Sequence, residues 1–351
     1  MSIGWGVIGA GGIASRRTIP EGILPTRGAR LAAVMDVDGA RAQAASERFG
    51  GVPWFTDAEP LLARDDVDAV YSATPTIAHA PQALAAIAAG KHVLVEKPLA
   101  MTVAEARRIA AAAQRKGVLV GTGFMMRHHG AHRKALELIR QGAIGKPVLG
   151  RAQLSCWYPP IPGAWRQDPK LGGGGSFIDM GNHCFDLLEM FLGRTTEVHA
   201  FTANLIHGYP SEDTAVVTFR FGSGAFGVVD NLFNVPDEAS KNVLEIYGSA
   251  GSIRCEGTIG QAPGGILRLV SVQAGGYDAR QQRSAARERL VRFPLINTYR
   301  AEIEDFTRAI RTGGQPTVPI EDGLWNQRVV EAAYRSARTG RAVKVAPLSP
   351  S

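Results

Sequence analysis

The first third of the chain alternates short apolar runs with alanine-rich stretches of helical period. The runs that predict strands are 3–8, 29–36, 52–55, 67–73, 92–96 and 118–121. The stretches that predict helices lie around 39–49, 57–64, 78–89 and 102–116. Because strands that alternate with helices form βαβ units, residues 1–124 are predicted to form a doubly wound α/β domain with a parallel sheet covered on both faces.

The pattern changes after residue 124. A predicted helix over 132–147 ends at Gly142 or Gly145 and then at Pro147. The strand-like runs that follow are 148–157, 196–205, 213–221, 224–233, 242–248 and 266–272, and the helical ones are 176–192, 299–312 and 321–338. For residues 125–351 we therefore predict an α+β domain with a large open, mainly antiparallel sheet and helices on one face.

Composition agrees with a protein of two globular domains. The chain has 351 residues, 45% of them apolar and 20% charged. No run reaches the roughly 18 apolar residues that a membrane helix needs. The first residues enter strand-like sequence at once, without the basic and apolar regions of a signal peptide. We therefore expect a cytoplasmic protein with no membrane role.

Cysteines and charge exclude two further classes. Cys156, Cys184 and Cys255 are odd in number and far apart, which indicates reduced thiols rather than a disulfide framework. The net charge is +7, with arginines concentrated in 278–292. Acidic residues are interspersed there, and no aromatic residues or nucleic-acid motif accompany them. We expect this stretch to be a solvated loop or a subunit contact, not a nucleic-acid site.

A glycine-rich turn follows the first predicted strand and begins a helix. In the sequence GVIGAGGIA, Gly9, Gly11 and Ala14 have the spacing of the G-x-G-x-x-G/A fingerprint, and Gly12 and Ile13 lie in the same turn. The glycines permit a tight turn and a close approach to a pyrophosphate, which the free N–H groups of the helix start would bind. A purely structural glycine turn is the alternative, but the βαβ context favours a dinucleotide site.

Asp36 ends the second predicted strand. A carboxylate at this place accepts hydrogen bonds from the adenosine ribose and repels a 2′-phosphate, so NAD is preferred to NADP. Arg41 is close enough in sequence to weaken that repulsion, so NADP is not excluded. Asp38 is an alternative contact, and a solvated turn aspartate is the non-functional alternative.

The carboxyl ends of the fourth and fifth predicted strands add polar residues to the edge of the sheet where ligands bind. The residues after the fourth strand are Thr74, Pro75 and His79. Glu96 and Lys97 end the fifth strand, and Pro98 makes the Lys97–Pro98 bond a candidate cis peptide. An ammonium placed there would stabilise alkoxide charge on a substrate. The alternative is an ordinary Glu–Lys pair at a strand end.

A glycine run, 172–175, precedes a predicted helix with Ser176 as its N-cap. The glycines let the backbone pass close to another body, which we expect to be the nicotinamide end of the cofactor. Asp179, His183 and Asp186 are spaced i, i+4 and i+7 and therefore share one stripe. Histidine suits removal of a hydroxyl proton near neutral pH, and Asp179 would orient the substrate. A satisfied Asp–His pair in the core is the alternative.

These segments resemble the glucose–fructose oxidoreductase / inositol dehydrogenase / MocA (Gfo/Idh/MocA) family. The matching stretches, which span nearly the whole chain, are GVIGAGGIA, AGKHVLVEKPLA, GAIGKP, WRQDPKLGGGGSFIDMGNHCFDLLEMFLG, YRAEIEDFTRAIRTGG and EDGLWNQRVVEAAYRSARTG. The E-K-P and G-G-G…D-x-G-x-H…D elements are the specific ones. The resemblance implies an N-terminal Rossmann domain, a C-terminal domain whose open sheet forms oligomer contacts, and NAD(P)-dependent oxidation or reduction of sugars, polyols or related compounds.

By position, the resemblance assigns the catalytic lysine to Lys97, the substrate-orienting aspartate to Asp179 and the acid–base histidine to His183. These three residues are also the expected substrate contacts, together with Trp165 and Arg166.

Further matched positions surround this set. The resemblance places Arg127 near the cofactor or substrate, and the end of the fifth predicted strand brings Glu96 and Lys97 to the edge where the cofactor is expected. The proline usual after Arg127 is replaced by His128, His129 and a glycine, whose role the sequence leaves open. These histidines lack partners at metal-ligand spacing, so no metal site is expected. Trp157, Tyr158 and Trp165 are candidate platforms for a sugar ring, with ordinary core or rim aromatics as the alternative.

The predicted function is that of a cytoplasmic NAD(P)-dependent dehydrogenase or reductase acting on CH–OH groups of a sugar or polyol. We expect a homo-oligomer, dimer or tetramer, formed through the C-terminal sheet. Two alternatives use the same cofactor site: an NAD-dependent glycoside hydrolase or lyase that oxidises its substrate transiently, and a non-catalytic sugar sensor. The presence of all three expected catalytic residues argues against the sensor.

Overall fold

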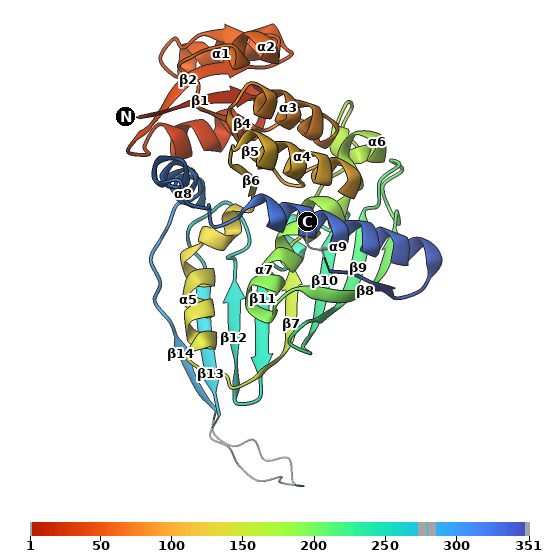
Figure 1. The fold of residues 1–351 in the computed structure, drawn as a ribbon. Coiled ribbons are helices and arrows are strands. Elements are labelled where there is room, and N and C mark those ends of the chain that lie inside the picture. Colours follow the sequence, from red (N-terminus) through yellow and green to blue (C-terminus); the bar gives the residue numbers. More distant parts are fainter. Residues whose placement is uncertain (1, 273–278, 280–285, 348–351) are drawn as a thin grey trace. The chain divides into compact units, whose positions relative to one another are not determined.

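The computed structural model describes residues 2–272, 279 and 286–347 (Figure 1). The chain divides into two compact units. Unit 1 comprises Met1–Met125, Asp168–Gly173 and Asn297–Glu331, and unit 2 comprises Met126–Gln167, Gly174–Ile296 and Ala332–Ser351. Two later segments thus fold with the first 125 residues.

Unit 1 contains a six-stranded parallel sheet, which confirms the predicted doubly wound α/β fold. Its strand order is β3-β2-β1-β4-β5-β6. The strands are β1 (Ile3–Ile8), β2 (Ala29–Met35), β3 (Trp54–Phe55), β4 (Ala69–Ser72), β5 (His92–Glu96) and β6 (Val120–Gly123). The order reverses between β1 and β4, and in such sheets ligands bind at the carboxyl ends of the strands at this switch point.

Eight helical segments belong to unit 1 in the described structure. They are η1 (Ala10–Ile23), α1 (Gly39–Arg48), α2 (Ala58–Leu62), α3 (Thr76–Ala88), α4 (Val103–Lys116), α6 (Pro169–Gly172), α8 (Thr298–Thr312) and the first part of α9 (Ile320–Thr339). The buried faces of α3 and α4 are rich in alanine. Thr102 and Glu105 form a capping box at the start of α4. The indole of Trp5 donates to Thr307 at 3.2 Å and packs on Phe306, which ties α8 into unit 1.

The described part of unit 2 contains a nine-stranded sheet of order β14-β13-β12-β11-β7-β10-β9-β8-β15. Its strands are β7 (Pro147–Gln153), β8 (Thr195–Ala203), β9 (Thr214–Phe221), β10 (Phe226–Leu232), β11 (Val243–Gly248), β12 (Gly251–Glu256), β13 (Ile266–Ser271), β14 (Arg287–Leu290) and β15 (Val343–Lys344). All pairs are antiparallel except β7 with β10. The prediction of a large, mainly antiparallel sheet is confirmed.

Three of these strands were not predicted, and each lacks a clear apolar pattern. β12 follows a glycine-flanked hairpin, β14 is mostly charged, and β15 has two residues. The basic stretch 278–292 was expected to be a solvated loop or a subunit contact, and its Arg287–Leu290 part pairs with β13 as a strand rather than forming a loop. Residues 278 and 280–285 of that stretch lie outside the described residues.

Helices α5 (Gly130–Arg140) and α7 (Asn182–Leu192) lie on the same face of the large sheet (Figure 1). The remaining helical turns of this part of the chain are η2 (Met125–His128), η3 (Trp165–Gln167), η4 (Phe177–Gly181) and η5 (Asp237–Ala239). α5 ends at Arg140, just before Gly142, the first of the two glycines predicted to end it, and Gly142 adopts a φ of 76° that favours glycine.

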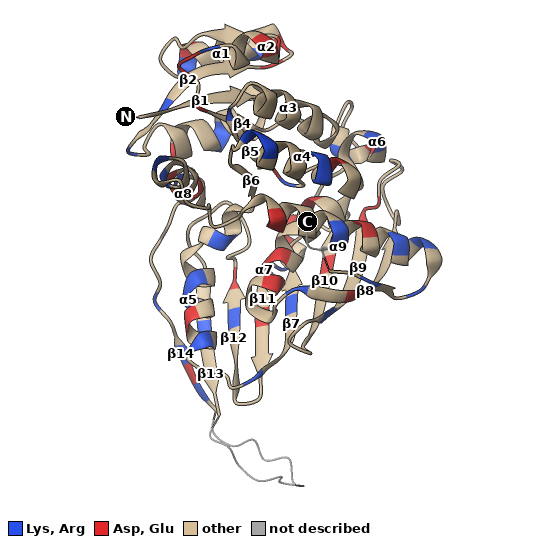
Figure 2. Ribbon diagram, viewed as in Figure 1, with Lys and Arg blue, Asp and Glu red and all other residues tan. Residues whose placement is uncertain are grey.

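The opposite face of the large sheet is exposed. Along β9, Ala215, Val217 and Phe219 are buried, whereas Val216 and Arg220 between and beyond them are exposed. Figure 2 shows charges of both signs along the strands of this sheet. No helix in the described ranges has both the length and the apolar character for a membrane crossing.

Candidate active site

The glycine-rich turn joins β1 to η1, and its backbone conformation and close contacts explain why glycines occur in it. Gly9 has a φ of 88°, and a Cβ there would lie 2.6 Å from the carbonyl oxygen of Ala73. At Gly11 a Cβ would lie 2.6 Å from Arg41 Cδ, so a larger residue is excluded. Gly12 and Ile13 follow, and a Cβ on Gly12 would meet no atom within 4 Å. The exposed turn therefore has room for a pyrophosphate beside its backbone, as the fingerprint predicts.

Asp36 lies directly beside this turn. Its carboxylate accepts the Gly11 N–H at 2.8 Å and the Asp38 N–H at 3.1 Å. Asp38 instead caps α1 and pairs with Arg41 at 3.2 Å. This arrangement favours Asp36 over Asp38 as the residue that would meet the ribose, and it leaves the Arg41 guanidinium engaged with Asp38.

His79 connects the two loops that follow β4 and β5. It is buried, and its ring nitrogens lie 2.7 Å from the carbonyl oxygen of Pro98 and 3.0 Å from that of Thr74. The Thr74 hydroxyl donates to Gln82 at 2.8 Å, and Pro75 begins α3. His79 therefore ties these two loops together and helps to fix the shape of this edge of the sheet.

Glu96 and Lys97 end β5, and the Lys97–Pro98 peptide is cis, as the sequence predicted. The Glu96 carboxylate accepts the Lys97 N–H at 3.2 Å and the hydroxyl of Tyr71, which itself accepts from Thr18 at 3.0 Å. Burial and the charge of Glu96 raise the pKa of Tyr71, so its phenol remains a donor. The charged strand end is thus stabilised by partners within unit 1.

In unit 2 the predicted polar stripe lies on η4 and α7. Asp186 is 1% exposed and binds the guanidinium of Arg127, with Nη2 to Oδ1 at 2.6 Å and Nε to Oδ2 at 2.9 Å. Asp179 pairs with Arg166, Nε to Oδ1 at 3.3 Å. His183 lies between these two carboxylates in sequence and is half-buried. Arg127, expected near the cofactor, therefore orients the helix that carries His183.

The start of this helix differs from the prediction at Ser176. Ser176 has helical dihedral angles and its hydroxyl makes no capping bond, so it does not cap the helix with its side chain. A Cβ on Gly174 would lie 1.9 Å from the Tyr334 hydroxyl, and one on Gly175 would lie 2.0 Å from the carbonyl oxygen of Glu212. These two glycines therefore allow close packing of the helix start against other parts of unit 2.

Arg166 links the expected substrate residues of unit 2. Its guanidinium lies 4.2 Å from the centroid of the Trp165 ring and pairs with Asp179. It also hydrogen-bonds Tyr158, the pKa of which is raised by burial and lowered in part by Arg166. Trp157 is 43% exposed, so its ring is available to a ligand. Tyr158 was named only as an aromatic platform, yet its hydroxyl belongs to the polar cluster.

The histidines after Arg127 have structural contacts. His129 is buried, and its Nδ1 accepts the Ala131 N–H at 3.1 Å, so it caps the start of α5. The His128 Nδ1 lies 2.6 Å from Nη2 of Arg133. Within the described residues, no group of three or more His, Cys, Asp or Glu side chains is placed to hold a metal ion.

His132 packs beside His129, and its burial leads us to expect that the folded protein loses stability in acid. Its Nδ1 lies 2.8 Å from the Met126 carbonyl and its Nε2 3.0 Å from the Thr258 hydroxyl, and burial lowers its pKa from 6.5 to about 3. A folded-state pKa below the unfolded one adds stability above pH 6.5, and this is lost as the pH falls toward 3. Urea unfolding should show a weaker pH dependence over this range for His132→Gln than for the wild type. Equal slopes would contradict this role.

A glycine-rich βαβ turn beside a carboxylate is the arrangement by which Rossmann folds bind a dinucleotide. Residues 3–129 match the family model for the oxidoreductase family with an NAD-binding Rossmann fold, and residues 132–254 match the GFO/IDH/MocA C-terminal domain. The chain belongs to the Gfo/Idh/MocA family of oxidoreductases. The predicted family, cofactor class and reaction class are confirmed.

Curated relatives and solved structures agree with this placement. The chain is 32% identical to a 1,5-anhydro-D-fructose reductase of Ensifer adhaerens, over 97% of this chain and 98% of the relative. It is 30% identical to a myo-inositol 2-dehydrogenase of Thermotoga maritima, over 97% and 98%. The crystal structure of an aldose-aldose oxidoreductase from Caulobacter crescentus superposes with a TM-score of 0.86 at 27% identity, covering 98% and 100% of the two chains.

Proposed function

We propose that this protein is a cytoplasmic dehydrogenase or reductase that transfers a hydride between NAD and a hydroxyl or carbonyl carbon of a sugar or polyol. The observation that supports this most strongly is the ion pair between Arg166 and Asp179. Asp179 lies in η4, which leads directly into α7 and His183. A charged, hydrogen-bonding cluster with the Trp165 ring against Arg166 suits a ligand with hydroxyl groups and an apolar ring face. The three cysteines are thiols, which suits a reducing compartment.

The proposed roles follow from the chemistry of each side chain. Bound nicotinamide would supply the hydride acceptor or donor. In oxidation, His183 accepts the substrate hydroxyl proton, and in reduction it returns that proton. Lys97 stabilises negative charge on the reacting oxygen, and Asp179 orients the substrate hydroxyl. Trp165 holds the Arg166 guanidinium through its ring face, and this fixes the direction of Asp179.

Asp36 is proposed to select NAD. A like charge at about 4 Å and an effective dielectric near 20 costs ~4 kcal/mol, which disfavours a 2′-phosphate. Asp36→Asn removes the charge but keeps an oxygen for the Gly11 N–H. We expect the ratio of the Kd values for NADP and NAD to fall by at least about tenfold. The matched control is Asp38→Asn, which should leave the ratio unchanged; a shift in the control instead would make Asp38 the ribose contact.

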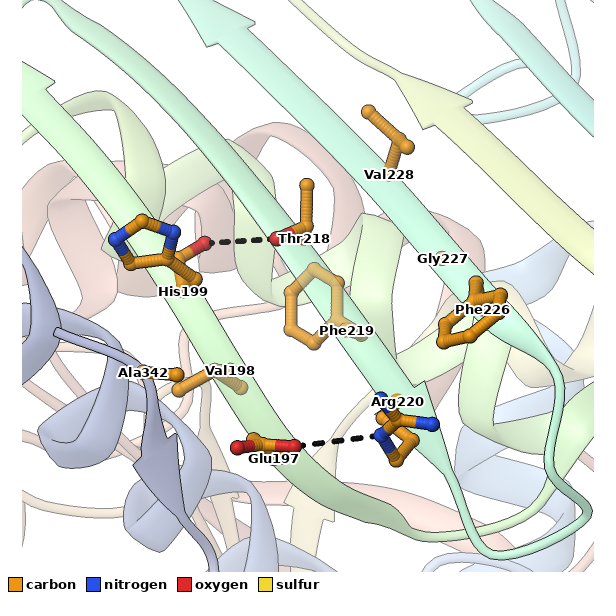
Figure 3. Close-up of a pocket in the computed structure, with 10 residues that line it drawn as sticks. All are labelled: Glu197, Val198, His199, Thr218, Phe219, Arg220, Phe226, Gly227, Val228 and Ala342. Atoms are coloured by element: carbon orange, nitrogen blue, oxygen red, sulfur yellow. Dashed lines mark hydrogen bonds and ion pairs between the residues drawn. The ribbon is translucent and has the colours of Figure 1, made fainter.

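The proposed oligomer forms through the exposed face of the large sheet. The exposed apolar side chains of this face, between 39% and 67% exposed, are Phe201, Val216, Phe226, Ile266 and Leu290. One of them, Phe226, lines a shallow groove of about 460 Å³ across β8, β9 and β10 (Figure 3). Glu197 and Arg220 pair in it at 3.3 Å, and the Arg220 guanidinium lies over the Phe226 ring.

A second copy of this chain suits such a surface, because apolar rings are mixed with charges of both signs that a symmetric partner matches. Light scattering should give the mass of a dimer or tetramer for the wild type and a smaller mass for Phe226→Asp. A monomeric wild type would contradict the proposed assembly.

The reaction is tested by screening the purified protein with NAD and with NADP against aldoses, ketoses and polyols, by nicotinamide absorbance. Net formation or consumption of NADH with a free sugar supports the dehydrogenase or reductase. Cleavage of aryl glycosides without net cofactor change would show the hydrolase or lyase instead. Cofactor binding without turnover of any substrate would show a sensor.

A further inference from the structure

Glu212 is a partly buried acid outside the residues assigned above, and it contacts the segment before Asp179. We propose that Glu212 is a positioning residue, whose carboxylate fixes the first turn of the helix that carries Asp179 and His183. This inference rests on the proposed function, because it assigns Glu212 a part in that same reaction.

The bonds that Glu212 makes replace the missing N-cap. Its Oε2 accepts the Gly175 N–H at 2.8 Å, and its Oε1 accepts the Phe177 N–H at 3.1 Å. Its backbone carbonyl accepts the Ser176 N–H at 3.1 Å. The first N–H groups of a helix have no partner within the helix, and a carboxylate there also complements the helix dipole. Glu212 therefore accepts hydrogen bonds from three consecutive backbone N–H groups at the start of this helix, where Ser176 provides no side-chain cap.

Tyr334 of α9 holds the carboxylate in this place. Its hydroxyl donates to Oε1 of Glu212 at 2.8 Å, and its ring meets Phe177 edge-on at 5.8 Å between centroids. Burial and the nearby Glu212 charge raise the pKa of Tyr334, so the phenol stays a donor. Gly174 is required beside it, since any Cβ would overlap the hydroxyl. Gly174, the Glu212 carboxylate and the Tyr334 hydroxyl thus pack directly against one another.

The anchored turn leads directly to the reactive residues. The Asp179 N–H donates to the carbonyl oxygen of Gly175 at 3.1 Å, so the residue that Glu212 binds also starts the turn that carries Asp179. The next bond of this wide turn runs from the Asn182 N–H to Phe177, and His183 follows. A shift of Gly175 or Phe177 therefore moves both side chains, and a misplacement of 1 Å can lower a rate about 10²-fold.

The test compares Glu212→Gln with a control on the same helix as Tyr334. Gln keeps the size of the side chain but replaces one acceptor oxygen with a donor. We expect kcat to fall about ten- to hundredfold, with an unchanged Kd for NADH. Tyr334→Phe should show a smaller fall in kcat. The control is Ser336→Ala, which removes bonds to Ala200 and Arg341 and should lower the melting temperature but leave kcat within about twofold of the wild type.

Hydrogen exchange supplies a second measurement that needs no turnover. Without substrate, the backbone amides of residues 175–183 should exchange at least about tenfold faster in Glu212→Gln than in the wild type or in Ser336→Ala. An unchanged kcat or unchanged exchange in Glu212→Gln would overturn the inference, as would an equal loss of kcat in Ser336→Ala. If the wild type turns over no sugar with either cofactor, the proposed function fails, and the exchange measurement still decides whether Glu212 anchors this turn.

Discussion

His183→Ala should lower kcat by roughly 10²–10⁴-fold, because positioned acid–base catalysis contributes a factor of that size. The variant should bind NADH with unchanged affinity, since the cofactor fingerprint lies in unit 1. Steady-state kinetics with fluorescence titration of NADH separate the two effects. In a plot of kcat against pH, the inflection caused by titration of His183 should be absent from the variant.

Two further variants make this result specific. His183→Asn keeps a polar side chain without acid–base capacity and should lose as much activity as His183→Ala. His199→Ala changes a histidine on β8, on the exposed face of the same unit, and should retain the wild-type rate. A His183→Asn enzyme with wild-type turnover would show that this histidine carries no proton in the rate-limiting step.

Lys97→Met should lower kcat by roughly 10²–10³-fold, the cost measured when a single charge-stabilising donor is removed from a reacting oxygen. Methionine retains the length of the side chain, so packing beside Pro98 changes little. Lys97→Arg keeps the charge and should recover part of the rate. Stopped-flow measurement of NADH formation in a single turnover reports the step itself, and an equal loss in Lys97→Met and Lys97→Arg would point to shape rather than charge.

Local patterns were sufficient to predict much of the fold. Apolar runs separated by helical stretches predict the parallel sheet of unit 1, because each βαβ unit buries a complete strand. Pro98 marked the Lys97–Pro98 bond as a candidate cis peptide, and the sequence predicted the helical run that the structure divides into η4, with Asp179, and α7, with His183. Each of these features depends on residues that are close together in the sequence, so a short stretch of sequence is enough to predict it.

The contacts that hold these residues depend on distant parts of the chain. Arg127 and Asp186 are 59 residues apart, and Glu212 and Tyr334 are 122 apart, so no local spacing indicates either pair. The glycine run 172–175 does mark a place where other groups pack closely against the backbone. The sequence could not show that Tyr334 and Glu212 are among these groups. Strand β14 was missed for a similar reason, since its charged residues become a strand through pairing with β13.

The central claim is that Lys97 of unit 1 and His183 of unit 2 serve one hydride-transfer reaction. A double-mutant cycle tests it most directly, with the single-turnover rate of NADH formation measured for Lys97→Met, His183→Ala and the double variant. Residues that act on one reacting centre show strongly non-additive effects. We predict that the double variant is about as slow as the slower single variant. A double variant slowed by the full product of the two single effects would contradict the claim.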